Sequence, residues 1–210
     1  MTGTIRIREM RPEDSDFAAK LLVTCFRKTF EWAVGEKNLN GVINIEKRSM
    51  QNAPSCYYKH SLIATISDQL VGVCVLKMKS DSNPNEGSFC YTYSNVGCRG
   101  CCGLWCMGVC SSYFMHENLF EKSSSCYLDV IFVHPEFQQR GIGSRLLCEA
   151  EVKAAESGCN KIYLWVEADN YQAIHLYKRQ GYSVIRDVDG VCFTYCGLGS
   201  RYYCKMEKYL

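Results

Sequence analysis

Two glycines in front of a predicted helix are the first residues of this sequence whose spacing suggests a chemical role. Residues 138–144 read Gln-Gln-Arg-Gly-Ile-Gly-Ser and follow an apolar run that ends just before Pro135. Because Gly141 and Gly143 have no Cβ, a ligand can approach the backbone closely at both positions. The N–H groups at a helix start have no helical partner, and the helix dipole adds positive potential there. The segment therefore predicts a seat for a diphosphate, with Arg140 as a further charged contact.

The same glycines are compatible with an ordinary tight turn between a strand and a helix, and the residues alone leave both interpretations open. Two other phosphate-binding motifs are excluded. The sequence contains neither the Gly-x-x-x-x-Gly-Lys-Ser/Thr loop that holds nucleoside triphosphates nor the Gly-x-Gly-x-x-Gly fingerprint that holds dinucleotides. A phosphate-bearing ligand of another kind is therefore the functional interpretation.

A second block of sequence gives the turn a family context. Residues 170–182 read Asn-Tyr-Gln-Ala-Ile-His-Leu-Tyr-Lys-Arg-Gln-Gly-Tyr. This block is similar to the Asn-x-x-Ala-x-x-x-Tyr-x-x-x-Gly-Phe/Tyr signature of the GNAT acetyltransferase superfamily. The Gln-x-x-Gly-x-Gly run that begins at Gln138, after Val-x-Pro, resembles the acetyl-CoA motif of the same superfamily. The match covers roughly residues 126–182 and leaves residues 80–125 outside it.

The resemblance implies an acetyl-CoA-dependent N-acetyltransferase. In this superfamily an amine attacks the thioester of acetyl-CoA directly, so the protein must hold both reactants close and manage the protons. The acceptor is expected to be a primary amine of a small molecule or of a peptide or protein. A non-catalytic acyl-CoA-binding module with the same turn is the alternative. The residues that the resemblance assigns to acetyl-CoA are Ile131, Phe132, Val133, Gln138, Gln139, Arg140, Gly141, Ile142, Gly143, Ser144, Asn170, Ala173 and Tyr177.

Tyr177 occupies the tyrosine position of the second block, and the resemblance makes it the candidate general acid. A phenol with an ordinary pKa of about 10 is protonated at neutral pH and can donate a proton to the departing thiolate. The spacing alone also fits a buried aromatic residue, because Ala173, Ile174 and Tyr177 share the inner face of a helix that Asn170 caps. Both interpretations stay open on the residues.

Asp129 is the candidate base or amine-orienting group. On a regular strand its side chain shares one face with Ile131 and Val133, beside the backbone that is expected to hold the cofactor. Some superfamily members that acetylate polyamines have a glutamate at the matching place, and the shorter aspartate favours proton transfer through a water. An exposed or ion-paired aspartate explains the residue equally well. Glu167 and Asp169, after the next strand, are further candidates for the acceptor site.

The order of predicted elements indicates how these residues are brought together. The later half of the chain alternates strands and helices, which favours a mixed α/β sheet covered by helices. With the resemblance, this predicts an α/β (α+β) GNAT fold in one domain over residues 1–210, with a central sheet of about six to seven strands and helices on both faces. The predicted elements are a strand at 4–8, a helix from 12 to about 28, a less regular helical region at 29–60, strands at 61–66 and 70–76, a strand at 127–133, a helix at 144–156, a strand at 162–166, a helix from 170 to 181, and closing strands near 191–195 and 201–208.

Residues 80–125 form a cysteine-rich insert before the fourth expected strand. Cys98, Cys102, Cys106 and Cys110 recur at four-residue intervals and would form one stripe on a helix. The glycines of the insert weaken an isolated helix and permit close approach of a partner backbone. A helix or loop packed over the substrate cleft, a zinc site built on a Cys-x-x-Cys pair, contact with a membrane surface and a redox role all remain open. No set of metal ligands is assigned.

Composition places the chain among ordinary globular proteins. Hydrophobic residues make up 47% and charged residues 22%, and the net charge of +2 gives no sign of a nucleic-acid-binding surface. Residues 1–10 alternate apolar and charged side chains, without the continuous apolar core of a signal peptide. The fifteen cysteines are therefore interpreted as free thiols in the cytoplasm. No transmembrane segment is expected, and neither the amine acceptor nor the oligomeric state can be read from the sequence.

Overall fold

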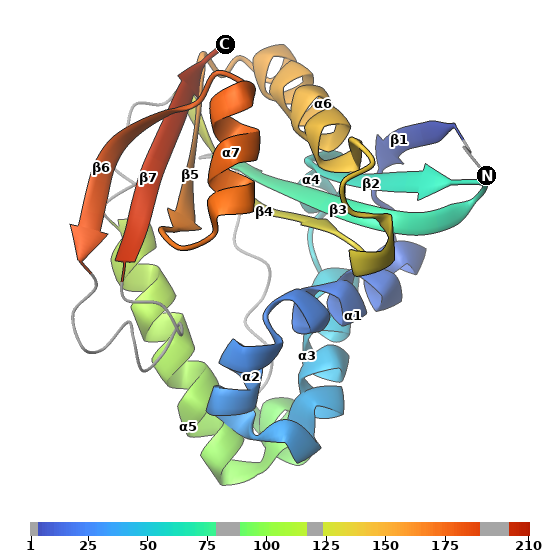
Figure 1. The fold of residues 1–210 in the computed structure, drawn as a ribbon. Coiled ribbons are helices and arrows are strands. Elements are labelled where there is room, and N and C mark those ends of the chain that lie inside the picture. The colour runs from blue at the N-terminus through green and yellow to red at the C-terminus, as the bar shows by residue number, and fades with distance from the viewer. Residues whose placement is uncertain (1–3, 79–88, 117–123, 190–201) are drawn as a thin grey trace.

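The computed structural model describes residues 4–78, 89–116, 124–189 and 202–210, and these parts form one mixed sheet with helices on both faces (Figure 1). The seven described strands lie in the order β1-β2-β3-β4-β5-β7-β6. Among them β4 and β5 are parallel, and the other neighbours are antiparallel. The predicted mixed sheet is confirmed. The strands are β1 Ile5–Glu9, β2 Ser61–Ile66, β3 Gln69–Met78, β4 Ser125–Val133, β5 Lys161–Glu167, β6 Ser183–Asp189 and β7 Tyr202–Tyr209.

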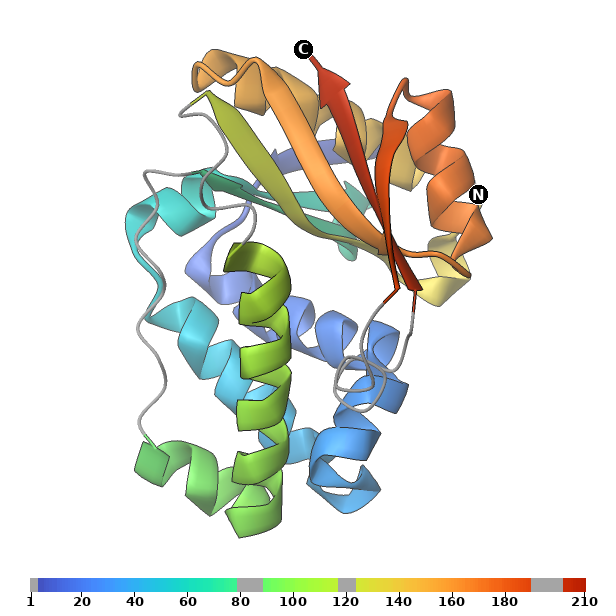
Figure 2. The same cartoon turned by 90° about the vertical axis from the view of Figure 1, so that its left-hand side faces the viewer.

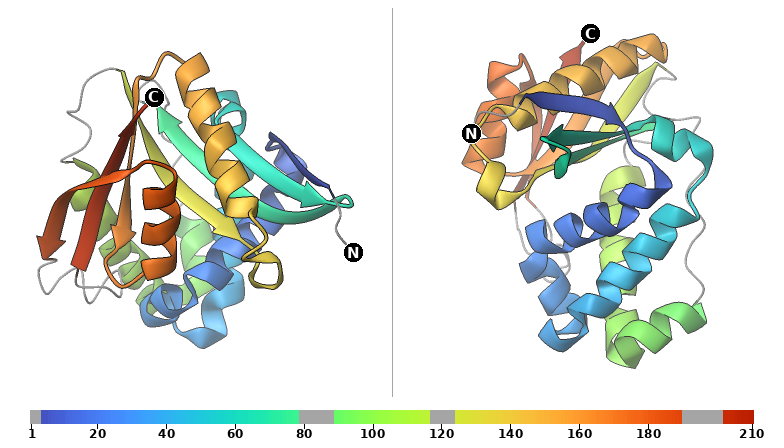
Figure 3. Two further views of the ribbon diagram at one scale, coloured as in Figure 1. Left: turned by 45° about the horizontal axis from the view of Figure 1, so that its top comes forward. Right: turned by 90° about the vertical axis from the view of Figure 1, so that its right-hand side faces the viewer.

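Helices cover both faces of the sheet. Helices α6 and α7 lie over one face, whereas α1 to α3 and the long α5 lie on the other (Figures 1 and 2). The left view of Figure 3 shows α6 running in front of the sheet, with α7 beside it. The helices are α1 Ser15–Cys25, α2 Arg27–Val34, α3 Leu39–Gln51, α4 Ser55–Lys59, α5 Phe89–His116, α6 Ile142–Glu156 and α7 Tyr171–Arg179, with short 3-10 turns at η1 Pro12–Asp14, η2 Glu36–Asn38 and η3 Pro135–Phe137.

Three apolar clusters hold these layers together. Leu146 and Leu147 of α6 pack with Leu164 of β5 in the cluster on the α6 side of the sheet. Val73 of β3 packs with Leu21 of α1 in the cluster on the opposite side. A third cluster joins α2, α3 and α5 away from the sheet. Burying each such side chain contributes about 1.5–3 kcal/mol, so the two faces of the sheet are held independently.

Several predicted elements differ from the structure. The helix expected to reach residue 28 ends at Cys25, because Phe26 leaves the helical region with φ −104° and ψ 29° before α2 begins. Strand β6 was not expected, because apolar and polar residues do not alternate along it as they do on a half-buried strand. The adjacent Val184 and Ile185 are both exposed, at 39% and 45%. The closing strand predicted near 191–195 lies outside the described residues. The helix predicted at 144–156 begins two residues earlier, at Ile142.

The cysteine-rich insert contains α5, which bends at Gly97, where φ is +68°. A Cβ at Gly103 would lie 2.0 Å from the carbonyl oxygen of Ala33 in α2. A Cβ at Gly41 in α3 would lie 2.2 Å from the carbonyl oxygen of Asn95 in α5. The backbone of α5 therefore lies directly against α2 and α3, and glycine at each contact makes this possible.

The outward side of α5 carries part of the expected cysteine stripe. Cys98 and Cys102 are exposed and Cys106 is half-buried, whereas the side chain of Cys110 lies outside the described part. No group of three metal-ligating side chains is close enough to hold an ion within the described residues. Over the same residues, no helix has the length and apolar character needed to cross a membrane.

Candidate functional site

The sheet opens between β4 and β5. The two strands pair only from Ser125 to Tyr127 on β4 and from Lys161 to Tyr163 on β5. Beyond these pairs β4 continues to Val133 without a described strand on its β5 side. Tyr127 and Tyr163 stack at the last pair, with ring centroids 5.3 Å apart. The opening leaves backbone groups of β4 free to bind an extended ligand, and the expected residues Ile131, Phe132 and Val133 lie along it.

The turn that follows β4 holds its backbone in an unusual conformation. Gln139 has φ +61°, which is strained for a residue with a Cβ, and Gly141 has φ +78°. Gly141 is the N-cap of α6, and no side chain caps this helix end. The N–H of Arg145 makes the first helical bond, to the carbonyl of Gly141 at 3.1 Å.

The amides of residues 139–144 have no backbone or side-chain acceptor among the described residues. A helix start with free N–H groups and a positive dipole end is suited to a diphosphate. Gln138 does not fill the turn, because its side-chain amide donates to the carbonyl of Val133 at 3.1 Å. The structure thus retains the free donors that the sequence predicted.

Neighbouring side chains leave the turn accessible. Gly143 faces α7, where an added Cβ would lie 3.4 Å from Leu176. Arg140 is exposed, and its guanidinium donates to the carbonyl of Glu136 at 3.0 Å. Ile142 is buried beneath the turn at 1% exposure and anchors the helix start. Ser144 follows at a half-buried position. The buried Ile142 side chain thus anchors a turn whose residues 138–141 are exposed.

Tyr177 lies in α7 at the apolar cluster beneath α6. It is 6% exposed, and its ring lies 5.7 Å from that of Tyr182. Burial raises the pKa of the Tyr177 phenol, and Cys74 raises it further. The predicted cap of α7 is confirmed, because Oδ1 of Asn170 accepts from the N–H of Ala173 at 3.1 Å. Tyr177 is therefore a buried aromatic residue whose hydroxyl stays protonated at neutral pH.

Asp129 does not share a face with Ile131 and Val133, so that expectation is wrong. A β-bulge interrupts the register, since Val75 of β3 pairs with Val130 and the next pair skips Asp129. Ile131 and Val133 pack on the α6 side of the sheet. Asp129 faces the opposite side, into a pocket that Val130 also lines. The extra residue of a bulge cancels one step of the strand alternation.

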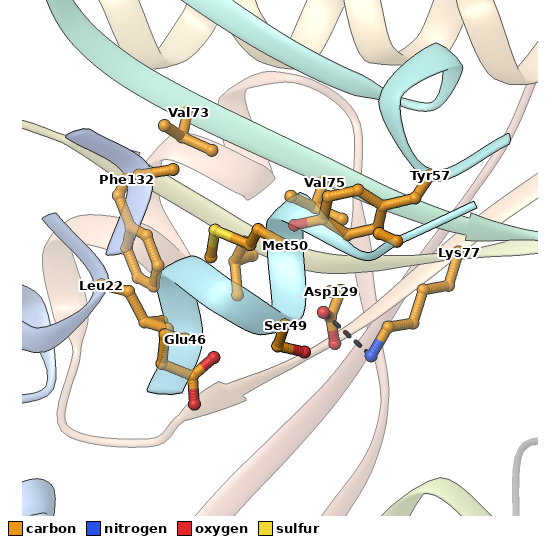
Figure 4. Close-up of a pocket in the computed structure, with 13 residues that line it drawn as sticks. Leu22, Glu46, Ser49, Met50, Tyr57, Val73, Val75, Lys77, Asp129 and Phe132 are labelled. Carbon is orange, nitrogen blue, oxygen red and sulfur yellow. Dashed lines mark ion pairs between the residues drawn. The ribbon is translucent and has the colours of Figure 1, made fainter. Parts of the chain in front are cut away.

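This pocket lies between the sheet and the helices α1, α3 and α4 (Figure 4). Its volume is about 160 Å³. Aliphatic and aromatic side chains form most of its wall, and the polar lining residues include two carboxylates and one ammonium group. The lining residues are Ala18, Leu22, Glu46, Ser49, Met50, Ala53, Tyr57, Val73, Val75, Lys77, Asp129, Val130 and Phe132.

Three ionisable residues of the pocket were not predicted: Glu46, Tyr57 and Lys77. Lys77 lies on the pocket face of β3, and its Nζ is 3.0 Å from Oδ2 of Asp129. Burial and, to a smaller extent, the Asp129 charge raise the pKa of Glu46 to about 7, against the lowering effect of Lys77. Burial likewise raises the pKa of the Tyr57 phenol, helped by Asp129 and Glu46. The pocket therefore joins a fixed ion pair to a carboxyl group that titrates near neutral pH.

The other acidic candidates lie elsewhere. Glu167 ends β5 and is half-buried, and burial together with Asp169 raises its pKa. Asp169 is exposed, and neither residue lines the pocket. No sequence motif marked Glu46, because it belongs to a helical region whose residues carried no chemical pattern. The tertiary fold alone brings it to Asp129.

Comparison with known proteins gives this arrangement a family. The model of the acetyltransferase (GNAT) family matches residues 27–182. The bovine thialysine N-epsilon-acetyltransferase is 33% identical over 90 residues, which make up 42% of this chain and 52% of that protein. An uncharacterised N-acetyltransferase of Methanocaldococcus jannaschii is 39% identical over 70 residues, or 33% of this chain and 31% of that protein. The matches thus span about half of the first of these curated relatives and about a third of the second.

Solved structures match the fold over nearly the whole chain. An N-acetyltransferase from Staphylococcus aureus Mu50 has a TM-score of 0.61 at 17% identity, covering 97% of this chain and 100% of its own. A PaiA N-acetyltransferase from Thermoplasma acidophilum, solved in complex with coenzyme A, has a TM-score of 0.56 at 17% identity, covering 99% of both chains. At such identities the likeness concerns the fold alone.

Proposed function

The chain belongs to the GNAT acetyltransferase family, whose co-substrate is acetyl-CoA, and on that premise we propose that it transfers the acetyl group directly to a primary amine bound in the pocket between α1, α3 and β4. One observation carries this proposal. The free amides at the start of α6 lie at the end of β4, next to the backbone edge that the departure of β5 leaves open. A diphosphate on the turn and an extended arm along that edge would direct a thioester toward the centre of the sheet.

The residues present fit acetyl-CoA by their chemistry. Donors without partners at residues 139–144 suit the diphosphate, and Gly141 supplies the left-handed backbone that exposes them. Backbone groups from Ile131 to Val133 can pair with the amides of the pantetheine arm, as the family resemblance implies. The co-substrate supplies an activated acyl group. The protein then has to orient the amine, accept its proton and return one proton to the leaving sulfur.

Tyr177 is the proton donor of this proposal. Its buried phenol remains protonated through the neutral pH range, because burial raises its pKa. A protonated hydroxyl can donate to the departing thiolate, which is the role that its place in the second sequence block implies. Asp129, on the other side of β4, has its carboxylate held by Lys77 and faces the pocket where the amine would lie.

The pocket favours a small cationic amine with an apolar stem. Its volume of about 160 Å³ is limited, and Val73, Val75 and Phe132 contribute apolar wall. Glu46 and Asp129 together carry more negative charge than Lys77 offsets once Glu46 is ionised. An alkylammonium group is attracted to this balance of charge, whereas an acidic acceptor is repelled. We therefore place small alkylamines ahead of large or acidic acceptors in the proposal.

The test is release of free CoA thiol from acetyl-CoA in the presence of a panel of amines. Primary alkylamines of three to six carbons, lysine, a polyamine and peptides with a free N-terminus are compared by kcat/KM. The small alkylamines are expected to rank first. Binding of CoA without transfer to any amine would instead identify a non-catalytic acyl-CoA-binding module. Absence of CoA binding by well-folded protein would overturn the proposal altogether.

Substitution of Tyr177 examines its assigned role. Tyr177→Phe is expected to lower kcat about 100-fold, the usual contribution of a positioned acid, with little change in CoA affinity. Tyr171→Phe is the matched control, because Tyr171 begins the same helix and is 73% exposed. If both variants keep the original kcat, Tyr177 has no part in the chemistry.

A further inference from the structure

Two carboxyl groups line the pocket, and within the described residues only Asp129 forms an ion pair. Glu46 is half-buried and forms none there. It projects from α3 into the same cavity that Asp129 enters from β4 (Figure 4). The two residues are 83 positions apart in the chain, and the packing of α3 under the sheet brings them to one site. The fold itself does not require two carboxyl groups in a small, largely apolar pocket.

Asp129 forms an ion pair with Lys77. Its Oδ2 lies 3.0 Å from Nζ of Lys77, and the two side chains are 24% and 33% exposed. The bulge in β4 fixes the direction of Asp129, and pairing between β3 and β4 fixes Lys77 beside it. A carboxylate held by an ammonium group has a fixed direction and can orient a second cation, whereas Glu46 forms no such ion pair among the described residues.

We infer that Glu46 is the general base that deprotonates the acceptor amine, whereas Asp129 and Lys77 form a fixed pair that positions the amine and tunes Glu46. The inference deepens the proposed function and rests on it. Glu46 is a catalytic residue in this scheme, because it touches the reacting ammonium. Lys77 is a positioning residue that acts through Asp129.

The proton and bond balance follows directly. Glu46 accepts one proton from the bound ammonium and passes it to solvent, which leaves a neutral amine with a free electron pair. The carbon–nitrogen bond forms at the acetyl carbon while the carbon–sulfur bond breaks. Tyr177 gives its proton to the sulfur and regains one from the nitrogen that becomes the amide. The overall reaction converts an ammonium ion and a thioester into an amide, a thiol and one proton.

The groups that face Glu46 from the neighbouring elements are compatible with its role as a base. Its pKa is raised to about 7, mainly by burial and also by the Asp129 charge, while Lys77 opposes the rise. A base with a pKa near the working pH accepts a proton readily and is still ionised often enough to act. Tyr57 faces it from α4 as a neutral phenol.

The cations next to Glu46 on α3 are engaged elsewhere. Nζ of Lys47 lies 2.9 Å from Oδ1 of Asp16 in α1, and the guanidinium of Arg48 stacks over the ring of Tyr91, 4.1 Å from its centroid. The lining residues of α1 are Ala18 and Leu22, which carry no charge. Lys77 is thus the cation that lines the pocket with Glu46, and substitution of Lys77 and Asp129 should tune it in opposite directions.

The pH dependence of kcat/KM tests the inference on the full chain, with the best alkylamine of the panel as acceptor. The unmodified protein should lose activity below an inflection near the pKa of Glu46. Glu46→Gln should lower kcat/KM at pH 8 about 100-fold and remove that inflection, because an amide cannot accept the proton. Asp129→Asn should move the inflection to lower pH, since a neighbouring negative charge is removed. Lys77→Met should move it to higher pH, and Lys77→Arg should leave it in place.

A second readout separates this inference from the proposed function. The carbon resonance of the Glu46 carboxyl group, identified by its absence in Glu46→Gln, should titrate near neutral pH without any substrate present. Glu149→Gln is the matched control, because Glu149 is exposed on α6 at the other face of the sheet. Normal kcat/KM and an unchanged inflection in Glu46→Gln would overturn the inference while leaving the acetyltransferase proposal intact. Failure of the unmodified protein to acetylate any amine would overturn both.

Discussion

The two sides of β4 are built in different ways. On the side where we propose that acetyl-CoA binds, here called the cofactor side, the turn at 138–144 presents backbone amides, and neighbouring residues in the chain determine its shape. On the side where we propose that the amine binds, here called the acceptor side, the pocket is made by side chains of α1, α3, α4, β3 and β4, which are far apart in the sequence. A site made of backbone depends on local conformation, whereas a site made of converging side chains depends on the packing of whole elements. The two sides should therefore fail independently when they are damaged.

Charge separates the two sides as well. The cofactor side offers the positive end of a helix dipole and the guanidinium of Arg140, which suit an anion. The acceptor side offers Glu46 and Asp129 against the single ammonium group of Lys77, which suits a cation. Between them, the opening beyond Tyr127 and Tyr163 is the place where an anionic co-substrate and a cationic acceptor can meet. This difference gives three predictions.

The largest effect is expected where α5 supports the acceptor side. Gly103→Val places atoms within 2.0 Å of the Ala33 backbone, so α5 and α2 must separate. We expect the free energy of unfolding to fall by about 3 kcal/mol. CoA affinity should be retained in the folded fraction, because the turn lies on the other face of the sheet. Denaturant unfolding and calorimetry with CoA measure the two quantities.

Two companion variants keep that prediction informative. Cys102→Val adds volume at the neighbouring exposed position and should leave stability nearly unchanged. Gly100→Ala is a smaller change, since its Cβ would lie 2.6 Å from the Val96 side chain. This variant takes the place of Gly103→Val in the experiment if Gly103→Val does not fold. A parallel loss of stability and of intrinsic CoA affinity would show that the two sides are not independent.

The next effect concerns the cofactor side. Gly141→Val forces a β-branched residue into a left-handed backbone at φ +78°, so the turn should rearrange. CoA affinity should fall about 100-fold, which corresponds to about 2.7 kcal/mol, as measured by calorimetry. Gly158→Val is the matched control, because Gly158 has φ +83° at the far end of α6. Equal losses of CoA affinity in both variants would mean that general strain, and not the turn, sets binding.

The smallest effect concerns pH and stability on the acceptor side. The pKa of Glu46 is raised in the folded protein to about 7 from the model-compound value of 4.5. The folded state therefore binds more protons than the unfolded state between these values, and stability falls as pH rises through them. Glu46→Gln removes this cost, so it should match the unmodified protein at pH 4 and exceed it by about 2 kcal/mol at pH 8. Denaturant unfolding at the two pH values measures the difference, with Glu149→Gln expected to show none.

Residues with local roles were predictable from the sequence. The free amides at 139–144 and the Asn170 cap follow from short-range rules for helix starts. The glycines of the insert were expected to permit close backbone approach, and Gly103 does so against Ala33. Such features need only a few neighbouring residues to be correct. The sequence blocks also identified Tyr177, whose assigned role as proton donor is still a prediction.

Asp129 shows where local rules end. Its position on β4 was predicted correctly, but its predicted direction was wrong, because a bulge between Leu128 and Val130 turns it to the opposite face. A bulge arises from the pairing of two strands and leaves no mark in the alternation of one strand alone. The exposed edge strand β6 was missed for a related reason, since neither of its faces is buried enough to impose a pattern.

The sequence by itself determined the family, the mixed sheet and the backbone turn at 138–144, because these depend on short-range conformation and on motifs that lie within a few residues of one another. Only the tertiary structure decided the acceptor side. Glu46, Lys77 and Asp129 come from three elements, and their shared pocket exists because α3 packs under β3 and β4. The raised pKa of Glu46 follows from that packing, since burial and the neighbouring Asp129 charge arise only when the distant segments meet.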